Sequence, residues 1–451
     1  MRIVVCAKVI NGELNPFDES ALEYALRLSR DVTLLTMGPP SARDVLLPLT
    51  RLGAKAVLLS DTLFAGSDTL ATAYVLSEAI KKIGYDLVVC GRQSIDGDTA
   101  QVGPMLSEML GIGVITSVID AECNESTVTA RTREGYESLP LPALITMERS
   151  FVLRFPSIFS RVGEVSVWSN AELGCDERKC GLVGSPTRVV KTFESERGRR
   201  RCRFISFDEL LPLIDELRHS EHLKTKELPA STGKLKKVFA VGEEVYQSAL
   251  EIGECVVKQI DLTPTELAEL VKKEKPDAIL WNADRRGRRD APIVAAMLGA
   301  GLCADCTMLE CDGEELYMYR PALSGSITAK IKSLTRPVMA TVRCDSFSSG
   351  VVVSVGKGAS GKMDKARELA NLLGAELTGS RGAVDMGLIP YEGQIGVTGR
   401  VISPNIYLAI GISGAVHHTT AIEGAGKIIA INPDKDARIF DYADYGITEP
   451  F

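Results

Sequence analysis

Residues 86–97 read Asp86-Leu-Val-Val-Cys-Gly-Arg-Gln-Ser-Ile-Asp-Gly97, an apolar run that stops at a polar loop. A related run, Asp277-Ala-Ile-Leu-Trp281, begins 191 residues later (277 − 86 = 191) and also leads into a polar loop. Each run is followed by a helical pattern that closes on a glycine. These glycines, Gly111 and Gly299, are 188 residues apart (299 − 111 = 188). The repeat indicates duplication of one α/β domain.

Outward from these runs, apolar strands alternate with amphipathic helices. Strands are expected at Ile3–Val9, Val32–Met37 and Lys55–Ser60, and helices at Asp18–Arg30 and Asp68–Gly84, with Asp68 as the helix cap. Uniformly apolar strands between amphipathic helices indicate parallel sheets that are covered on both faces. The predicted fold class is therefore α/β.

The length of the chain bounds the number of domains. At about 150 residues per domain, 451 residues correspond to roughly three domains. We expect α/β domains at residues 1–190, 236–348 and 349–451. Residues 191–235 differ in composition and are expected to be a linker with one docking helix, at Phe207–Leu217.

Composition excludes several classes of protein. The net charge is −7 (52 − 59), which argues against a nucleic-acid binder. No run approaches 18 apolar residues and the N-terminus reads as a strand, so we expect a cytoplasmic protein without a membrane span. The 11 cysteines indicate reduced thiols. Cys303-Ala-Asp-Cys306 has the spacing of a metal or redox site, but no histidine lies nearby. Small buried residues are the preferred interpretation, and no metal site is expected.

The loop Gly91–Gly103 is the first candidate site. It follows a buried strand and leads into a helix, whose first N–H groups would attract phosphate. Ligands of parallel sheets bind at the carboxyl ends of strands, so Cys6–Val9, Ser60–Asp61 and Ala65–Thr69 should converge on the same edge. The alternative interpretation is a structural loop that only caps the helix.

The second candidate is a glycine-rich turn. Gly356-Lys-Gly-Ala-Ser-Gly361 fits G-x-G-x-x-G between a strand, Val351–Val355, and a helix expected at Asp364–Leu373. Glu376 lies 18 residues after Gly358 (376 − 358 = 18), near the place of a ribose-binding acid. The pattern predicts a dinucleotide site. Because the chain has no nucleophile elbow and no His-Glu-x-x-His motif, we expect a cofactor to carry the chemistry.

Long motifs in sequence order carry a resemblance to a known family. They include Asn15-Pro-Phe-Asp18, Phe64-Ala-Gly-Ser-Asp-Thr-Leu-Ala71, Arg336-Pro-Val-Met-Ala-Thr-Val342, Ser380-Arg-Gly-Ala-Val-Asp385 and the stretch Tyr407–His418. The chain resembles electron-transfer flavoprotein, with a beta-like part fused to an alpha-like part that follows it. The family fold implies two related domains of adenine-nucleotide-hydrolase type, which accounts for the repeat, and a C-terminal FAD-binding domain.

The resemblance implies FAD in the C-terminal domain. It places Arg381 against the isoalloxazine ring and His418 near the O2 edge, where charge on the reduced ring would be stabilised. The hydroxyls of Thr398 and Ser413 would bond the flavin. The cofactor-binding residues expected are Gly356, Lys357, Gly358, Ser380, Arg381, Gln394, Gly396, Thr398, Gly399, Ser413, Gly414, Ala415, His417, His418, Asn432 and Asp434, the last two at the adenosine end.

Three positions depart from the family pattern. Lys357 replaces an arginine, which keeps the charge but loses the two-pronged guanidinium. Val397 and His417 replace glutamines, which could retune the flavin without removing it.

In the beta-like half, the resemblance implies AMP at the Gly91–Gly103 loop, or a second FAD as in electron-bifurcating members. The residues expected at this second nucleotide site are Ala7, Lys8, Asn15, Ser60, Asp61, Asp68, Thr69, Gly91, Asp96, Gly97, Asp98, Thr99, Gln101, Val102 and Gly103.

The resemblance also implies partners. Arg154, Pro156 and Ile158 match the start of the family's partner-docking loop, which is shortened here. The leading hypothesis is an FAD-dependent electron carrier, rather than a classical enzyme. It would run between a flavoprotein dehydrogenase (of the acyl-CoA dehydrogenase type or another) and a redox enzyme or quinone reductase. The alternatives are an electron-bifurcating, NADH-oxidising protein with two FAD and a non-redox nucleotide-binding scaffold. A fused chain needs no separate partner subunit, and self-association stays open.

Overall fold

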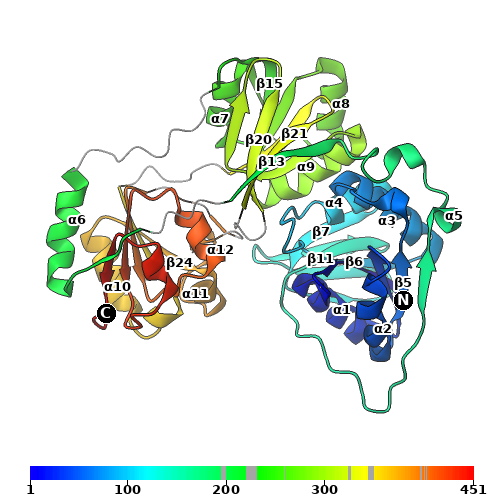
Figure 1. The fold of residues 1–451 in the computed structure, drawn as a ribbon, viewed down its shortest axis with the longest axis horizontal. Coiled ribbons are helices and arrows are strands. Elements are labelled where there is room, and N and C mark those ends of the chain that lie inside the picture. Colours follow the sequence, from blue (N-terminus) through cyan, green and yellow to red (C-terminus); the bar gives the residue numbers. More distant parts are fainter. Residues whose placement is uncertain are drawn as a thin grey trace. The chain divides into compact units, whose positions relative to one another are not determined.

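The structure is a computed structural model, drawn in Figure 1. The residues that it describes are 1–194, 200–219, 231–259, 261–322, 327–343, 350–396, 399–400, 402 and 404–451. The chain divides into two compact units. Unit 1 holds residues 1–192, 231–323 and 329–342, and unit 2 holds residues 193–230, 324–328 and 343–451.

A parallel sheet with the order β12-β5-β4-β1-β6-β11-β7 forms the first half of unit 1. The strands expected near residues 3, 32 and 55 are confirmed as β1, β4 and β5, with ends that differ by at most two residues. The bounds are β1 Arg2–Ala7, β4 Asp31–Met37, β5 Lys55–Leu59, β6 Leu87–Gly91, β7 Gly113–Val118, β11 Ala143–Met147 and β12 Val165–Trp168.

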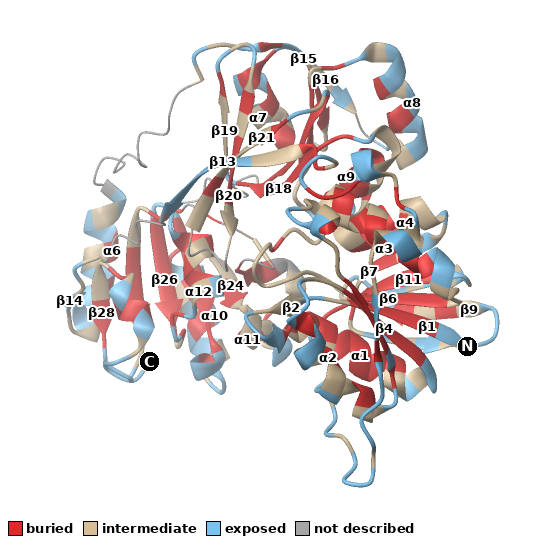
Figure 2. Ribbon diagram, turned by 45° about the vertical axis from the view of Figure 1, so that its right-hand side comes forward, coloured by how far each residue is buried: buried red, intermediate tan, exposed pale blue. Residues whose placement is uncertain are grey.

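Helices cover both faces of this sheet, as the apolar strands predict. Ile3 and Val5 of β1 pack with α1 and α2, whereas Val4 and Cys6 face the side of α3 and α4. Asp68 caps α3 through the N–H groups of residues 70 and 71, as expected from the sequence. The bounds are α1 Pro16–Leu28, α2 Ala42–Leu49, α3 Thr69–Ile83 and α4 Val102–Leu110, followed by α5 Asn170–Leu173. Figure 2 shows the buried strands between the helices.

The second half of unit 1 repeats this topology in the order β16-β15-β17-β22-β18, so β15 takes the place of β1 and β17 that of β6. Ser117 and Asp305, both with positive φ, interrupt β7 and β18 at points 188 residues apart (305 − 117 = 188). The described residues of this half contain no counterparts of β5 and β12. The bounds are β15 Leu235–Val241, α7 Val245–Ile252, β16 Gly253–Gln259, α8 Pro264–Glu274, β17 Ala278–Asn282, α9 Arg285–Leu298, β18 Leu302–Cys306 and β22 Val338–Val342.

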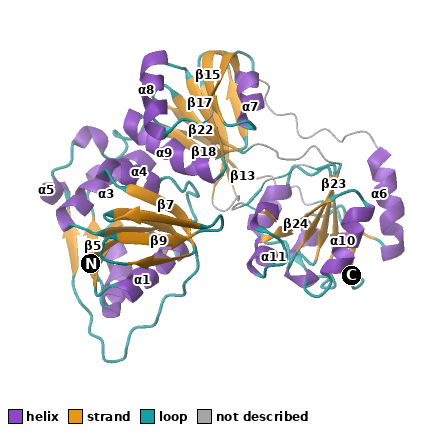
Figure 3. Cartoon of the chain, turned by 180° about the vertical axis from the view of Figure 1, so that it is seen from behind, coloured by secondary structure: helices purple, strands orange, loops and turns teal. Residues whose placement is uncertain are grey.

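The two halves of unit 1 share one core. Helix α4 packs against α9, and one apolar cluster contains Leu106 from the first half and Val294 from the second. Small antiparallel sheets flank the main ones (Figure 3), and β13 of the first half joins that of the second. The bounds are β2 Val9–Ile10, β3 Glu13–Leu14, β8 Asp120–Cys123, β9 Thr127–Arg131, β10 Tyr136–Pro140, β13 Thr187–Glu194, β19 Met308–Cys311, β20 Leu316–Ala322 and β21 Ile327–Ser333.

Unit 2 is built on a parallel sheet with the order β14-β28-β27-β26-β23-β24-β25. The strand expected at Val351–Val355 is confirmed as β23. The bounds are β14 Arg203–Phe204, α6 Leu210–His219, β23 Val351–Val355, α10 Met363–Leu372, β24 Glu376–Ser380, α11 Arg381–Asp385, β25 Gln394–Ile395, β26 Ile406–Ile410, α12 Val416–Thr419, β27 Lys427–Ile431 and β28 Tyr445–Ile447.

Part of the expected linker is built into unit 2. Strand β14 pairs with β28 at the edge of the sheet, and α6 buries Leu210 and Ile214 in the core beside β23 and α10. Arg200, from the basic cluster that precedes β14, pairs with Asp444 and donates to Ala425 O at 2.6 Å. The helix expected at Phe207–Leu217 is therefore a covering helix of this sheet.

Candidate functional site

The sheet of unit 2 has a topological switch point between β23 and β26. From β23 the chain adds β24 and β25 on one side, and from β26 it adds β27 and β28 on the other. The loops after β23 and β26 meet there, since Gly356 N donates to Ile410 O at 2.8 Å and Gly358 N to Gly411 O at 3.1 Å. A Cβ on Gly411, whose φ is +63°, would lie 2.7 Å from the carbonyl carbon of Gly358. Ligands of open α/β sheets bind at such points.

Two cations stand at this edge. Lys357 is exposed in the glycine-rich turn, and its methylenes lie over Gly382, where a Cβ would come within 2.9 Å of Lys357 Cγ. Arg381 opens α11 at the end of β24, with a side chain 35% exposed and Nε 3.6 Å from Asp385 Oδ2. Ser380 caps the same helix through Ala383 N at 3.4 Å. The two cations therefore reach the switch point from neighbouring strands.

The remaining expected flavin residues fall into three groups. Ser413, Ala415, His417 and Asp434 are exposed at the loops that follow β26 and β27. Asn432 bridges these loops, because its Nδ2 donates to Ile412 O at 2.9 Å. Gln394, Gly396 and Gly414 are buried, whereas Gly399 is half-buried, and Thr398 lies outside the described residues.

His418 is buried and held from both ring nitrogens. Its Nε2 lies 2.7 Å from the hydroxyl of Tyr407, and its Nδ1 lies 3.2 Å from Ile395 O. Because the carbonyl can only accept, Nδ1 carries the proton and the Tyr407 hydroxyl donates to Nε2. Burial lowers the pKa of His418 to about 4, although the bond to Ile395 O opposes this shift. The imidazole is therefore neutral at pH 7.

This edge of unit 2 fits a dinucleotide. Glycine backbone and Lys357 suit a pyrophosphate, the Arg381 guanidinium can lie beside a ring, and exposed Ser413 can donate to it. The described residues place no general acid or base with a raised or lowered pKa beside this exposed edge, other than the buried His418.

In unit 1, the loop after β6 closes on the end of β1. Lys8 Nζ pairs with Asp96 Oδ2 at 2.6 Å, and Asn15 bonds both Gln93 O at 2.9 Å and Ile95 N at 3.3 Å. Burial raises the pKa of Asp96, but the bonds from Lys8 and Ser94 outweigh it and leave that pKa lowered. Ala7, Lys8, Asn15, Gly91, Asp96, Gly97 and Asp98 thus come together at the switch point between β1 and β6.

Other residues expected at this second site have structural partners instead. Asp61 accepts from Leu63 N and Asn170 N, and Asp68 from its own helix and from Thr187. Thr69 donates to Gln101, whose amide donates to Leu302 O at 3.2 Å across the two halves. Ser60 N bonds the end of β12, Thr99 and Val102 are half-buried, and Gly103 packs on Thr146 of β11. For these residues the structure favours the capping interpretation.

Sequence reasoning missed the role of Asp18, although it belongs to the quoted motif at residue 15. Its carboxylate accepts from Lys8 N at 2.8 Å and from Gly91 N at 3.1 Å, so it ties the ends of β1 and β6 together. Burial raises its pKa to about 7 against the opposing effect of these bonds. A Cβ on Gly91 would overlap this carboxylate. Nothing in the local pattern distinguishes Asp18 from an exposed first-turn acid.

The loop between β11 and β12 extends away from the helices of unit 1 (Figure 1). Arg154 is anchored, with Nε and Nη2 each 2.9 Å from the carboxylate of buried Glu23. Pro156 is half-buried and Ile158 is exposed. The largest exposed side chains here were not predicted: Val152, Phe155 and Phe159 are 88%, 95% and 88% exposed. Exposed apolar groups of this density mark an interaction surface.

Three further findings concern cysteines, metals and membranes. Cys303, Cys306 and Cys311 are buried, and burial raises the pKa of Cys306 well above its usual value. Across the described parts of the chain, no group of three or more His, Cys, Asp or Glu side chains is arranged to hold a metal. None of the helices described here has both the length and the apolar character needed to cross a bilayer.

The sequence matches the electron transfer flavoprotein domain over residues 3–173 and 261–377, and the FAD-binding domain of the same family over residues 347–423. The chain belongs to the electron transfer flavoprotein family. The first match spans both halves of unit 1, and the second covers the glycine-rich turn and Arg381. The resemblance to a beta–alpha fusion is thereby confirmed, and the family supports FAD as a cofactor.

Curated relatives match the N-terminal part of this electron transfer flavoprotein. The beta subunit of electron transfer flavoprotein from Clostridium acetobutylicum is 42% identical over 197 residues, covering 41% of this chain and 76% of the relative. Protein FixA from Azorhizobium caulinodans is 41% identical over 222 residues, covering 44% and 79%. The subunit CarD of the caffeyl-CoA reductase-Etf complex from Acetobacterium woodii is 36% identical over 231 residues, covering 43% and 87%.

Proposed function

We propose that this family member is an FAD-dependent electron carrier. The observation that carries the proposal is the exposed edge at the β23–β26 switch point, where Lys357, Arg381 and Ser413 surround a glycine backbone. FAD, when bound, supplies the redox chemistry. Lys357 and the glycine-rich turn would hold the pyrophosphate. An exposed site with few titrating groups suits transfer of electrons to another protein, since no proton-transfer residue is needed.

Arg381 and His418 would have different tasks. The Arg381 guanidinium would supply positive charge beside the ring, which stabilises the reduced flavin electrostatically. His418 is neutral at pH 7 and is held by Tyr407 and Ile395 O, so we assign it a positioning role for the loop that carries His417. This assignment moves the charge that the family resemblance gave to His418 onto Arg381.

We further propose that the first half of unit 1 binds AMP at the β1–β6 switch point. Lys8 and the amides after Gly91 would face the phosphate, while the ion pair of Lys8 with Asp96 would open or adjust on binding. A second FAD at this place is the alternative. The capping residues Asp61 and Asp68 would shape the loops without touching the nucleotide.

The electron donor would dock on the loop between β11 and β12. Its exposed apolar side chains would bury against a flavoprotein dehydrogenase, of the acyl-CoA dehydrogenase type or another. Arg154, bound to Glu23, would anchor the loop rather than contact the partner. A redox enzyme or a membrane quinone reductase would accept the electrons.

Cofactor stoichiometry tests the proposal directly. The chain is purified without added flavin and denatured, and released FAD and AMP are quantified. One FAD and one AMP per chain are expected. Two FAD would favour the bifurcating alternative, for which rapid NADH oxidation is the second readout. Absence of flavin, even after incubation with FAD, would contradict the redox function.

A further inference from the structure

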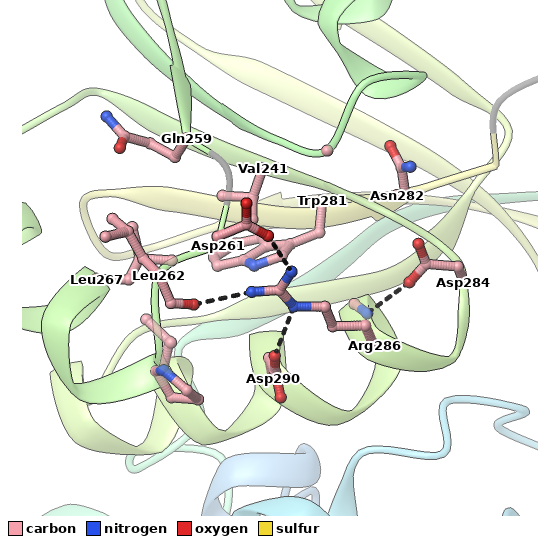
Figure 4. Close-up of a pocket in the computed structure, with 14 residues that line it drawn as sticks. Val241, Gln259, Asp261, Leu262, Leu267, Trp281, Asn282, Asp284, Arg286 and Asp290 are labelled. Atoms are coloured by element: carbon pink, nitrogen blue, oxygen red, sulfur yellow. Dashed lines mark hydrogen bonds and ion pairs between the residues drawn. The ribbon is translucent and has the colours of Figure 1, made fainter.

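A pocket of about 90 Å³ lies in the second half of unit 1, away from both nucleotide sites described above. It opens at the carboxyl ends of β15, β16 and β17 and is bordered by the first turns of α8 and α9 (Figure 4). β15 pairs with both β16 and β17, so this is the switch point of the second sheet. Open parallel sheets bind ligands at this position.

The sheet register makes this pocket the counterpart of the β1–β6 edge. Ile3 pairs with Leu87 in the first half, and Val238 pairs with Ala278 in the second. Four residues further along each strand, Gly242 corresponds to Ala7 and Asn282 to Gly91. Gly242 has a φ of +117°, and a Cβ there would lie 2.7 Å from the Asn282 amide. Only glycine lets these two strand ends approach in this way.

Trp281 gives the pocket an unused donor. The side chain is 1% exposed, and its Nε1 has no hydrogen-bond partner among the described residues. Figure 4 shows the indole nitrogen beside the Arg286 guanidinium, among the lining residues. An indole N–H can only donate, and a buried donor without an acceptor is costly. A ligand that brings an acceptor atom would satisfy it.

The rim is acidic and its cation is engaged. Arg286 donates to Leu262 O at 3.0 Å and lies 3.5 Å from Asp261 and 3.4 Å from Asp290. Asp284 caps α9 through Gly287 N at 2.7 Å. Three carboxylates around one guanidinium disfavour a polyphosphate, but they can accept the hydroxyls of a sugar.

Size and wall chemistry narrow the ligand further. Leu262, Leu267 and Val294 form apolar walls, and the volume is below the roughly 300–1,000 Å³ of pockets for drug-sized ligands. One ring system fits, whereas a dinucleotide does not. We propose that this pocket binds a purine nucleoside, with the ring nitrogens accepting from Trp281 Nε1 and the ribose hydroxyls at Asp261 and Asp284. This inference goes beyond the proposed function and stands without it.

Tryptophan fluorescence provides the test, because the chain has only two tryptophans. The other, Trp168, lies in β12 with the Lys82 ammonium 4.9 Å from its ring centre. In the full-length Trp168→Phe protein, with its cofactors as isolated, adenosine is titrated to millimolar concentration. A saturable change in Trp281 emission is expected, weaker for ATP than for adenosine because of the acidic rim. Inorganic phosphate should have no effect.

Calorimetry with matched variants identifies the site. Trp281→Phe keeps the ring but removes the donor, and should weaken adenosine binding by about fivefold, the effect of one neutral hydrogen bond. Trp168→Phe should bind as the unmodified protein does. Lys8→Ala, in the first half, should leave this affinity unchanged.

Three outcomes would overturn the inference. They are an unchanged Trp281 emission at millimolar adenosine, equal adenosine affinity in Trp281→Phe, and a response to phosphate alone. Loss of all adenosine binding in Lys8→Ala, with Trp281→Phe unaffected, would place the only nucleoside site in the first half. That result would reject this inference and leave the electron-carrier proposal intact.

Discussion

At the scale of single residues, burial decides what a charged or polar group does. Asp18 and Asp68 are both first-turn or cap residues, yet Asp68 fulfils an ordinary capping role while Asp18 holds two strand ends from a buried position. Desolvation penalises the charged form of a buried carboxyl. The same effect keeps His418 neutral, so the positive charge at the flavin edge comes from Arg381 and Lys357.

Asp18 should titrate near neutral pH. Its pKa is raised to about 7 by burial, above an ordinary value of 3.8. A raised carboxyl pKa means that the folded chain holds the proton more tightly, so this contribution to stability is full below about pH 4 and is lost as the pH rises through about 7. Carbon-13 NMR of aspartate carboxyls should show one such titration, missing from Asp18→Asn. A set in which every aspartate titrates below pH 5 would contradict the assignment.

Replacement of Arg381 by alanine should weaken FAD binding and lower its reduction potential. Loss of a charge-assisted hydrogen bond costs about 1.5–3 kcal/mol, which corresponds to at least tenfold in affinity. Equilibrium dialysis and a spectroscopic redox titration measure the two effects. Arg367→Ala, an exposed arginine of α10 paired with Asp364, is the control. If both variants keep the original affinity and potential, Arg381 has no role at the flavin.

At the scale of elements, the chain uses a segment between its two α/β parts to complete a sheet. Helix α6 places Leu210 and Ile214, each 1% exposed, against β23 and α10, while Leu211 next to them is 45% exposed. The amphipathic pattern predicted a docking helix near this place. Because the surface it covers is formed by residues more than a hundred positions later, the pattern alone did not identify that surface.

Leu210→Ala should loosen α6 locally. Truncation of a buried leucine costs about 2–5 kcal/mol. Amide hydrogen exchange in α6 should therefore accelerate about 30-fold or more, with FAD bound or not. Leu211→Ala provides the matched control and should leave exchange unchanged. Equal protection in the two variants would mean that α6 is not held by this contact.

At the scale of the whole molecule, the duplication has joined two sheets into one core. Helices α4 and α9 pack together, Gln101 bonds Leu302 O from the other half, and β13 crosses into the second antiparallel sheet. A shared core of this kind should open as one cooperative element. Unit 2 has its own clusters of buried residues.

Met339→Ala should destabilise both halves of unit 1 together. Met339 is fully buried in the cluster that contains Val88 and Phe239, and its truncation costs about 2–5 kcal/mol. Hydrogen exchange of the slowest amides in β6 and β17 should rise by the same factor. Leu408→Ala in unit 2 should leave these amides unaffected. A rise in β17 without one in β6 would show that the halves unfold separately.

The sequence by itself determined the strands, the duplication, the glycine-rich turn and the family. These features depend on local periodicity and on residue types at fixed spacing, which a chain carries before it folds. Only the tertiary structure decided which polar groups face a ligand. Asp61, Asp68 and Gln101 turned to structural partners, Asp18 became a buried bridge, and Trp281 was left with an unused N–H. Each of these outcomes depends on atoms brought together from distant parts of the sequence, and on the water that their meeting excludes.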